Sequence, residues 1–274
     1  MSIKKPLALV VMMSFASLAS AGQITAEDET LDAAEMAEEV TLYLPSINEI
    51  HRDAKHVGIT GNWGSFIRVQ SKAYATMSKP QRAFEVGKTL SDIAFIVLDG
   101  PDSNAAPSKA IIQQAYNALV SLELPANIKA EIQTLKEQME MGRLKGKALR
   151  KRMDALLNEI VPQIEEDENL SIRDSGVLVL AAGYFKALYL GARTVGSYPT
   201  PTREQLDMFR WGELVDYFLN HLTQKATPEF KNNSTVKNFV VALKRIKPLV
   251  SKQQGEITKR DVKAIARALR LSFK

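Results

Sequence analysis

Apolar residues recur at helical spacing along almost the whole of this chain, and this periodicity is the strongest constraint on its fold. In one segment, expected to be a helix over about 80–99, apolar residues are three or four positions apart and Asp99-Gly100-Pro101 ends the pattern. The same reasoning predicts later helices over about 172–195, 202–224, 235–251 and 258–271. We find no convincing alternation of the kind that a strand requires. The sequence therefore predicts an all-α, multi-helix bundle.

Residues 176–195 are apolar enough to raise the question of a membrane span. Residues 177–183 are apolar on every side, which fits either a span or a buried central helix. Lys186 and Arg193 lie seven positions apart on one face, and both would be costly in hydrocarbon. Small residues at i, i+4 and i+8 form a smooth ridge for a neighbouring helix: Gly183, Ala187 and Gly191. We predict a central core helix and no transmembrane span in the mature chain.

Glycines that recur 96 residues apart suggest an internal repeat. Two pairs carry it, Gly87 with Gly183 and Gly100 with Gly196. The first member of each half, Gly87 or Gly183, lies within an apolar helix, and the second, Gly100 or Gly196, ends that helix. The hypothesis divides the chain into pseudo-repeated helical halves of about 40–142 and 143–274. Residue identity between the halves is otherwise poor, so a coincidence of common helix-ending glycines stays an equal alternative.

The N-terminal segment, residues 1–21, has the three parts of a secretory signal peptide. Lys4 and Lys5 precede an apolar run over residues 7–18, and Ala19-Ser20-Ala21 has the small-x-small pattern of a cleavage site. We expect cleavage after Ala21 and a mature all-α domain over residues 22–274. The chain contains no cysteine, which fits the bacterial periplasm better than a disulfide-stapled secreted module. It also excludes thiol nucleophiles, iron–sulfur clusters and zinc–thiolate sites.

Charge is distributed unevenly between the two ends of the mature chain. Residues 22–51 carry eight Asp and Glu and no Lys or Arg, whereas residues 231–274 carry 12 Lys and Arg against Glu256 and Asp261. The two ends could pair with each other, or the basic end could meet an anionic partner. In an exported protein, that partner would be an envelope protein, a polysaccharide or an anionic lipid rather than nucleic acid. Solvated helix faces are the simpler alternative.

The predicted C-terminal helix, about 258–271, combines an apolar face with a strongly basic one. Its cations are the candidate contacts with an anionic surface: Lys259, Arg260, Lys263, Arg267 and Arg270. Its apolar residues are Val262, Ile265, Ala266 and Leu269. The apolar face could enter a bilayer or dock on the bundle, and our interpretation favours docking.

Further candidate ligand contacts come from a glycine-rich stretch and from the central helix. Residues 58–65 precede a helix expected over about 65–77, and glycine amides at a helix N-terminus bind anions. This stretch supplies Gly61, Trp63, Gly64 and Ser65, and the central helix supplies Lys186 and Arg193. The stretch lacks the Lys of a phosphate-binding loop and the preceding strand of a dinucleotide fold, and Trp63 could simply cover the end of the bundle.

No catalytic or metal-binding pattern is evident. His51 and His56 are spaced i, i+5, which turns their rings about 140° apart on a helix. We therefore expect no metal, no cofactor and no catalytic residue, and we interpret the chain as an exported binding or interaction protein of the bacterial cell envelope. One alternative is a periplasmic enzyme whose site assembles only in the fold, from Lys186, Arg193 and either Asp92 or His221. Another is a peripheral membrane protein held by the basic C-terminal helix.

Overall fold

The computed structural model describes residues 47–60, 67, 73–99, 109–122, 124, 126–144, 148, 151–152, 155 and 168–273. All of these residues belong to one compact unit, Pro45–Lys274. The predicted signal peptide therefore lies outside the described residues.

The described residues form helices and no strand, which confirms the prediction of an all-α, multi-helix bundle. In the first part of the chain the elements are α2 (Ile47–His56), the 3-10 turn η2 (Tyr74–Thr76), α3 (Lys79–Asp99), α4 (Lys109–Val120) and α5 (Ala126–Glu140). From residue 170 they are α7 (Leu170–Ser197), α8 (Arg203–Asp207), α9 (Gly212–Asn220), the π-helical turn η3 (His221–Lys225), α10 (Pro228–Asn232), α11 (Ser234–Val250) and α12 (Lys259–Arg270).

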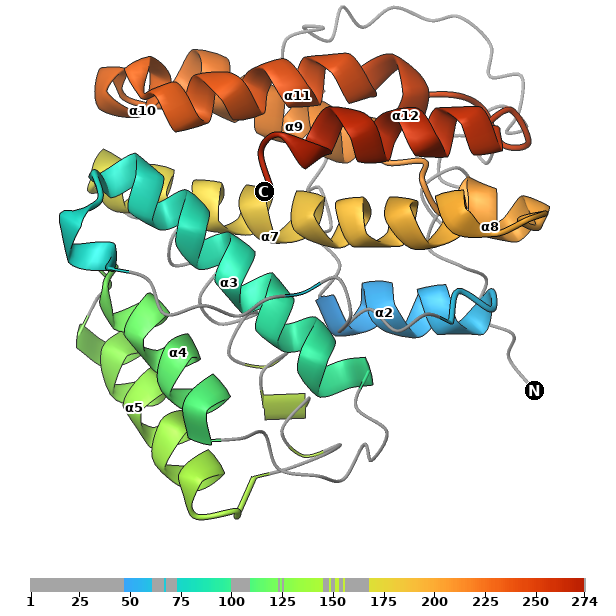
Figure 1. The fold of residues 1–274 in the computed structure, drawn as a ribbon. Coiled ribbons are helices and arrows are strands. Elements are labelled where there is room, and N and C mark those ends of the chain that lie inside the picture. Colours follow the sequence, from blue (N-terminus) through green and yellow to red (C-terminus); the bar gives the residue numbers. More distant parts are fainter. Residues whose placement is uncertain are drawn as a thin grey trace, which may run out of the picture. The chain divides into compact units, whose positions relative to one another are not determined.

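Helix α7 is the central core helix that the sequence predicts. It packs against α2, α3, η3 and α12, and Figure 1 shows it running between the α2–α3 side and the α11–α12 side. Among the described helices it alone is long and apolar enough to cross a membrane, by length and composition. In this structure, 83% of its most apolar 18-residue window is buried by other parts of the chain. Its hydrophobic surface is thus used in packing the bundle.

Helices α3 and α7 cross in direct contact at Gly87. A Cβ atom at Gly87 would lie 2.2 Å from the carbonyl oxygen of Val179 and 2.8 Å from the Cβ of Ala182. No side chain fits in that space, so glycine sets how closely the two helices approach. Further along α7, Gly191 faces the Phe209 ring instead, where a Cβ would lie at an ordinary 3.7 Å.

The repeat hypothesis stays a prediction, because Gly100 lies outside the described residues.

Two helix predictions are wrong in their extent. The helix expected over 202–224 is divided into α8, α9 and η3. Thr202 and Gln205 form a capping box that fits a short helix, and α9 begins at Gly212, whose missing Cβ would lie 2.7 Å from Ser251 Oγ. The backbone turns just before α9, at residues 208–209. Of the helix expected over 65–77, the described part contains only the 3-10 turn η2, beside the extended residue Met77.

Candidate functional site

Helix α12 begins with a capping box formed by Thr258 and Asp261, and Asp261 is the one acidic residue of this helix. The Asp261 carboxylate accepts hydrogen bonds from the amide and the hydroxyl of Thr258, and it pairs with Lys252 at 2.9 Å. Burial opposes ionisation of Asp261, but these hydrogen bonds and the lysine outweigh it and lower the pKa of the carboxyl. The charge of Asp261 is therefore paired with Lys252 and not with the cations that follow it along the helix.

The apolar face of α12 docks on the bundle, as our interpretation favoured. Val262, Ile265 and Leu269 are fully buried, and the helix packs against α7 and α11. The alternative in which this apolar face enters a bilayer is wrong, because its side chains already belong to the core. Ala266, the fourth residue of the predicted face, lies at its half-buried edge.

The five predicted surface cations lie together on the opposite side of α12. Lys259 is half-buried, and the other four are exposed: Arg260, Lys263, Arg267 and Arg270. Lys259 donates a hydrogen bond to the carbonyl of Pro199 at 2.9 Å. Within the part of the chain that the structure describes, the four exposed cations make no ion pair and no hydrogen bond. We call these five residues the basic face.

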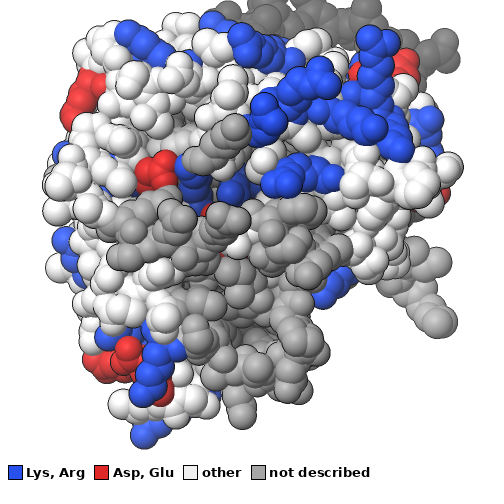
Figure 2. Space-filling view, viewed as in Figure 1, with Lys and Arg blue, Asp and Glu red and all other residues white. Residues whose placement is uncertain are grey.

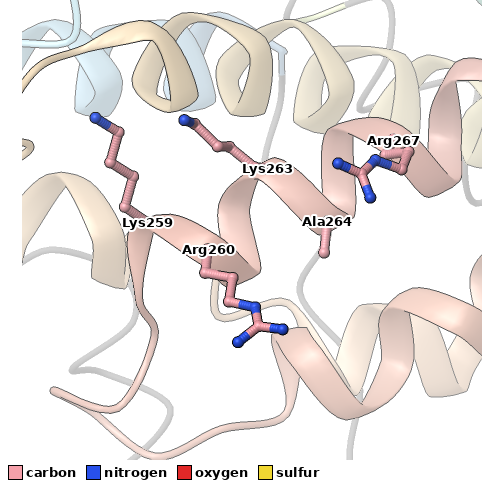
Figure 3. A pocket seen from close by; sticks show the side chains of 5 residues that line it. All are labelled: Lys259, Arg260, Lys263, Ala264 and Arg267. Atoms are coloured by element: carbon pink, nitrogen blue, oxygen red, sulfur yellow. The ribbon is translucent and has the colours of Figure 1, made fainter.

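The basic face borders a hollow of about 600 Å³. Four of the cations line it: Lys259, Arg260, Lys263 and Arg267. Figure 3 shows Arg260 and Arg267 on either side of the small side chain of Ala264, with Lys259 and Lys263 both pointing toward the top of the view. In Figure 2, Lys and Arg gather across the upper part of the view, where α11 and α12 lie in Figure 1. The volume lies within the range of about 300–1,000 Å³ typical of small-ligand sites.

Lys186 is buried in an ion pair inside the bundle. Its Nζ lies 3.1 Å from Oδ1 of Asp92 on α3, and both side chains are largely buried. The ammonium also lies 5.8 Å from the centre of the Tyr189 ring and 6.0 Å from that of Phe273. The structure thus joins Lys186 with Asp92, one of the two partners that the enzyme hypothesis named, in an arrangement that neutralises both charges.

Arg193 lies over the same Tyr189 ring as Lys186 does. Its exposed guanidinium covers the Tyr189 ring at 5.6 Å and donates a long hydrogen bond of 3.4 Å to the Tyr189 hydroxyl. His221 pairs instead with Asp174 near the start of α7, at 3.1 Å between Nε2 and Oδ1. The structure therefore brings Lys186 and Arg193 to the same ring, whereas His221 is paired with Asp174.

Asp174 is a buried functional group that the sequence reasoning missed. Its second oxygen, Oδ2, accepts a hydrogen bond of 2.7 Å from the amide of Thr227. Burial opposes ionisation of Asp174, but the hydrogen bonds with His221 and Thr227 outweigh it and lower the pKa of the carboxyl. The available signal was a lone acid close to the start of a long apolar helix.

The glycine-rich stretch enters the described structure only at its first residues. Gly61, Trp63, Gly64 and Ser65 lie outside the described residues. Gly58 has a φ of +76°, and the Gln205 amide donates hydrogen bonds to the carbonyls of Val57 and Gly58. The Tyr198 hydroxyl donates to the carbonyl of Thr60 at 2.7 Å. The beginning of this stretch is therefore held by α8 and by the C-terminal cap of α7.

The described part of the chain contains no group of three or more His, Cys, Asp or Glu arranged to hold a metal ion. Comparison with family models gives no match for this chain, and neither do the comparisons with curated proteins and with solved structures.

Proposed function

We propose that this chain is an exported helical-bundle protein of the bacterial cell envelope that binds an anionic partner through the basic face of α12. The observation that carries the proposal is a set of cations on one rigid helix with no carboxylate to neutralise them among the described residues. The buried apolar side of the helix holds these cations in place on the outside.

Some cations of this chain are paired with carboxylates, whereas the basic face gathers on one helix several cations that are unpaired within the described residues. Lys136 pairs with Glu140 along α5, and Lys247 of α11 pairs with Asp216 of α9. On α12, Lys259, Lys263 and Arg267 follow one another at i, i+4 and i+8. Like charges at this spacing destabilise a helix by about 0.2–0.5 kcal/mol per pair. Binding to an external anion would replace this repulsion with a favourable interaction, since each Lys or Arg near an anionic surface contributes about 1 kcal/mol to binding.

Binding fits these groups better than catalysis does. The basic face presents charges of one sign, whereas acid–base chemistry needs groups that can exchange protons near neutral pH. Two pairs of buried titratable groups, Lys186 with Asp92 and His221 with Asp174, form ion pairs inside the bundle. Their geometry supports a structural role, so we do not advance the enzyme alternative.

The binding proposal is tested with a soluble polyanion. We expect the purified protein to bind dextran sulfate at low salt, and the variant Lys263→Glu/Arg267→Glu to bind about 10–30-fold more weakly. The matched control is Lys109→Glu/Lys129→Glu, which makes the same charge change at exposed positions on α4 and α5. Equal affinities for all three proteins would overturn the proposal.

The proposal of export rests on the signal-like features of residues 1–21. We expect intact-mass analysis of the periplasmic fraction to give a chain that starts at Gly22. A cytoplasmic chain that retains the whole of this N-terminal segment would contradict export and leave the binding test unaffected.

A further inference from the structure

Leu271, at the C-terminal end of α12, is the most exposed large apolar side chain in the described part of the chain. Its side chain and backbone together are 72% exposed. A single exposed leucine is common on protein surfaces and by itself indicates nothing. Its significance depends on what holds it outward and on which residues surround it.

Leu271 is held outward by buried residues on both sides. Leu269 is fully buried, and Phe273, two positions beyond Leu271, is only 5% exposed. The Phe273 ring stacks on Phe84 at 5.7 Å and on Tyr189 at 6.0 Å, and the Ser272 amide donates to the carbonyl of Leu269. The backbone at Leu271 is still helical. The leucine is therefore exposed on a fixed helix end that is anchored in the core.

Leu271 continues the line of cations on α12. Lys263, Arg267 and Leu271 follow one another at intervals of four positions, so each neighbours the next on the helix surface. With Lys259 at the other end, the line extends over about 18 Å of helix. One apolar side chain thus lies directly beside the positive charges that line the hollow.

We infer that the anionic partner of the basic face is the surface of a phospholipid bilayer, into which Leu271 inserts. The inference rests on the function proposed above and names the partner of that same site. Lipid phosphates carry the charge opposite to that of the cations. The hollow that these cations line is large enough for a headgroup. The acyl region beneath the phosphates accommodates the leucine, while long Lys and Arg side chains keep their charges at the headgroup level. A soluble polyanion would satisfy the cations but offers no apolar environment to Leu271.

The inference is tested by measuring co-sedimentation of the purified protein with phospholipid vesicles. Vesicles of phosphatidylglycerol and phosphatidylethanolamine supply anionic headgroups, and vesicles of phosphatidylcholine alone serve as the uncharged comparison. We expect binding to the anionic vesicles only, weakening as salt rises. Leu271→Ser removes the apolar contact, and we expect it to weaken vesicle binding about 10-fold. Leu170→Ser, at another exposed leucine, should bind as the parent does.

Binding of dextran sulfate tests the proposed function of the basic face without testing whether the partner is a bilayer. Leu271→Ser should bind this polyanion with the parent's affinity, whereas Lys263→Glu/Arg267→Glu should lose affinity for both probes. If Leu271→Ser binds anionic vesicles as tightly as the parent does, or if the parent binds dextran sulfate but no vesicle, the bilayer is the wrong partner and the proposed function stands. If the parent binds neither probe, both proposals fall. Circular dichroism of each variant shows that the bundle is intact, and a folded Leu271→Ser keeps the test decisive.

Discussion

The Nε2 atom of His221 lies 3.1 Å from Oδ1 of Asp174, and both residues are buried. This pair joins the start of α7 to the π-helical turn η3, and the Thr227 amide ties the same carboxylate to the N-cap of α10. A carboxylate in such a position stabilises the fold only while both of its partners are present, because an unpaired buried charge is costly.

We predict that Asp174→Ala lowers the free energy of unfolding by about 3–5 kcal/mol, since it leaves His221 and the Thr227 amide without their acceptor. Chemical denaturation of the purified protein measures the change. The control Asp216→Ala removes a surface ion pair with Lys247 and should cost about 1 kcal/mol or less. Equal effects of the two substitutions would show that the buried pair contributes no more than a surface one.

The lowered pKa of Asp174 predicts a loss of stability in acid. The unfolded chain binds the proton near the ordinary value of 3.8, whereas the folded chain binds it only at lower pH. The contribution is therefore complete above the ordinary pKa and is lost as the pH falls through the folded pKa. We expect the free energy of unfolding to fall less steeply over this acid range in Asp174→Ala than in the parent. Parallel curves for the two proteins would contradict this assignment.

The close crossing at Gly87 predicts opposite effects for two glycine substitutions. Gly87→Ala places a Cβ 2.2 Å from the Val179 carbonyl oxygen and should destabilise the protein by about 1–3 kcal/mol. Gly191→Ala places its Cβ at an ordinary 3.7 Å from Phe209, and replacing a glycine inside a helix should stabilise by about 0.5–1 kcal/mol. Melting temperatures of the two variants should therefore shift in opposite directions. An unchanged melting temperature for Gly87→Ala would mean that α3 and α7 separate at little cost.

The buried pair of Lys186 and Asp92 predicts a strong coupling. Lys186→Met leaves a buried carboxylate, and Asp92→Leu leaves a buried ammonium, so each should destabilise the bundle by about 3–5 kcal/mol. The double variant should cost much less than the sum of the two, because it leaves neither charge unpaired. A double-mutant cycle of unfolding free energies measures this difference. Additive effects would mean that the two side chains do not depend on each other.

Helices whose apolar pattern continues through the whole element could be predicted from the sequence. Helix α7 was expected over about 172–195 and spans 170–197, and α12 was expected over about 258–271 and spans 259–270. In both, the local pattern and the buried face agree. The break before α9 was not evident in the helical periodicity, and Gly212, where α9 begins, packs closely against Ser251, which follows α11 far along the chain.

The part of the candidate site that lies within one helix could also be predicted from the sequence. The cations of the basic face belong to one helix, so their spacing alone placed them together. The pairing of Asp174 with His221 joins residues 47 positions apart, and the outward position of Leu271 depends on where Phe273 packs. Both are tertiary contacts, which a helical periodicity does not reveal.

The salt dependence of polyanion binding tests the role of the basic face most directly. Each cation that neutralises an anionic group releases counterions, so the logarithm of the affinity falls with the logarithm of the salt concentration in proportion to the number of such cations. For dextran sulfate we predict that Lys263→Glu/Arg267→Glu reduces this slope by about 2, while Lys109→Glu/Lys129→Glu leaves it unchanged. Identical slopes for the parent and both double variants would show that the anion binds elsewhere and would contradict the central claim.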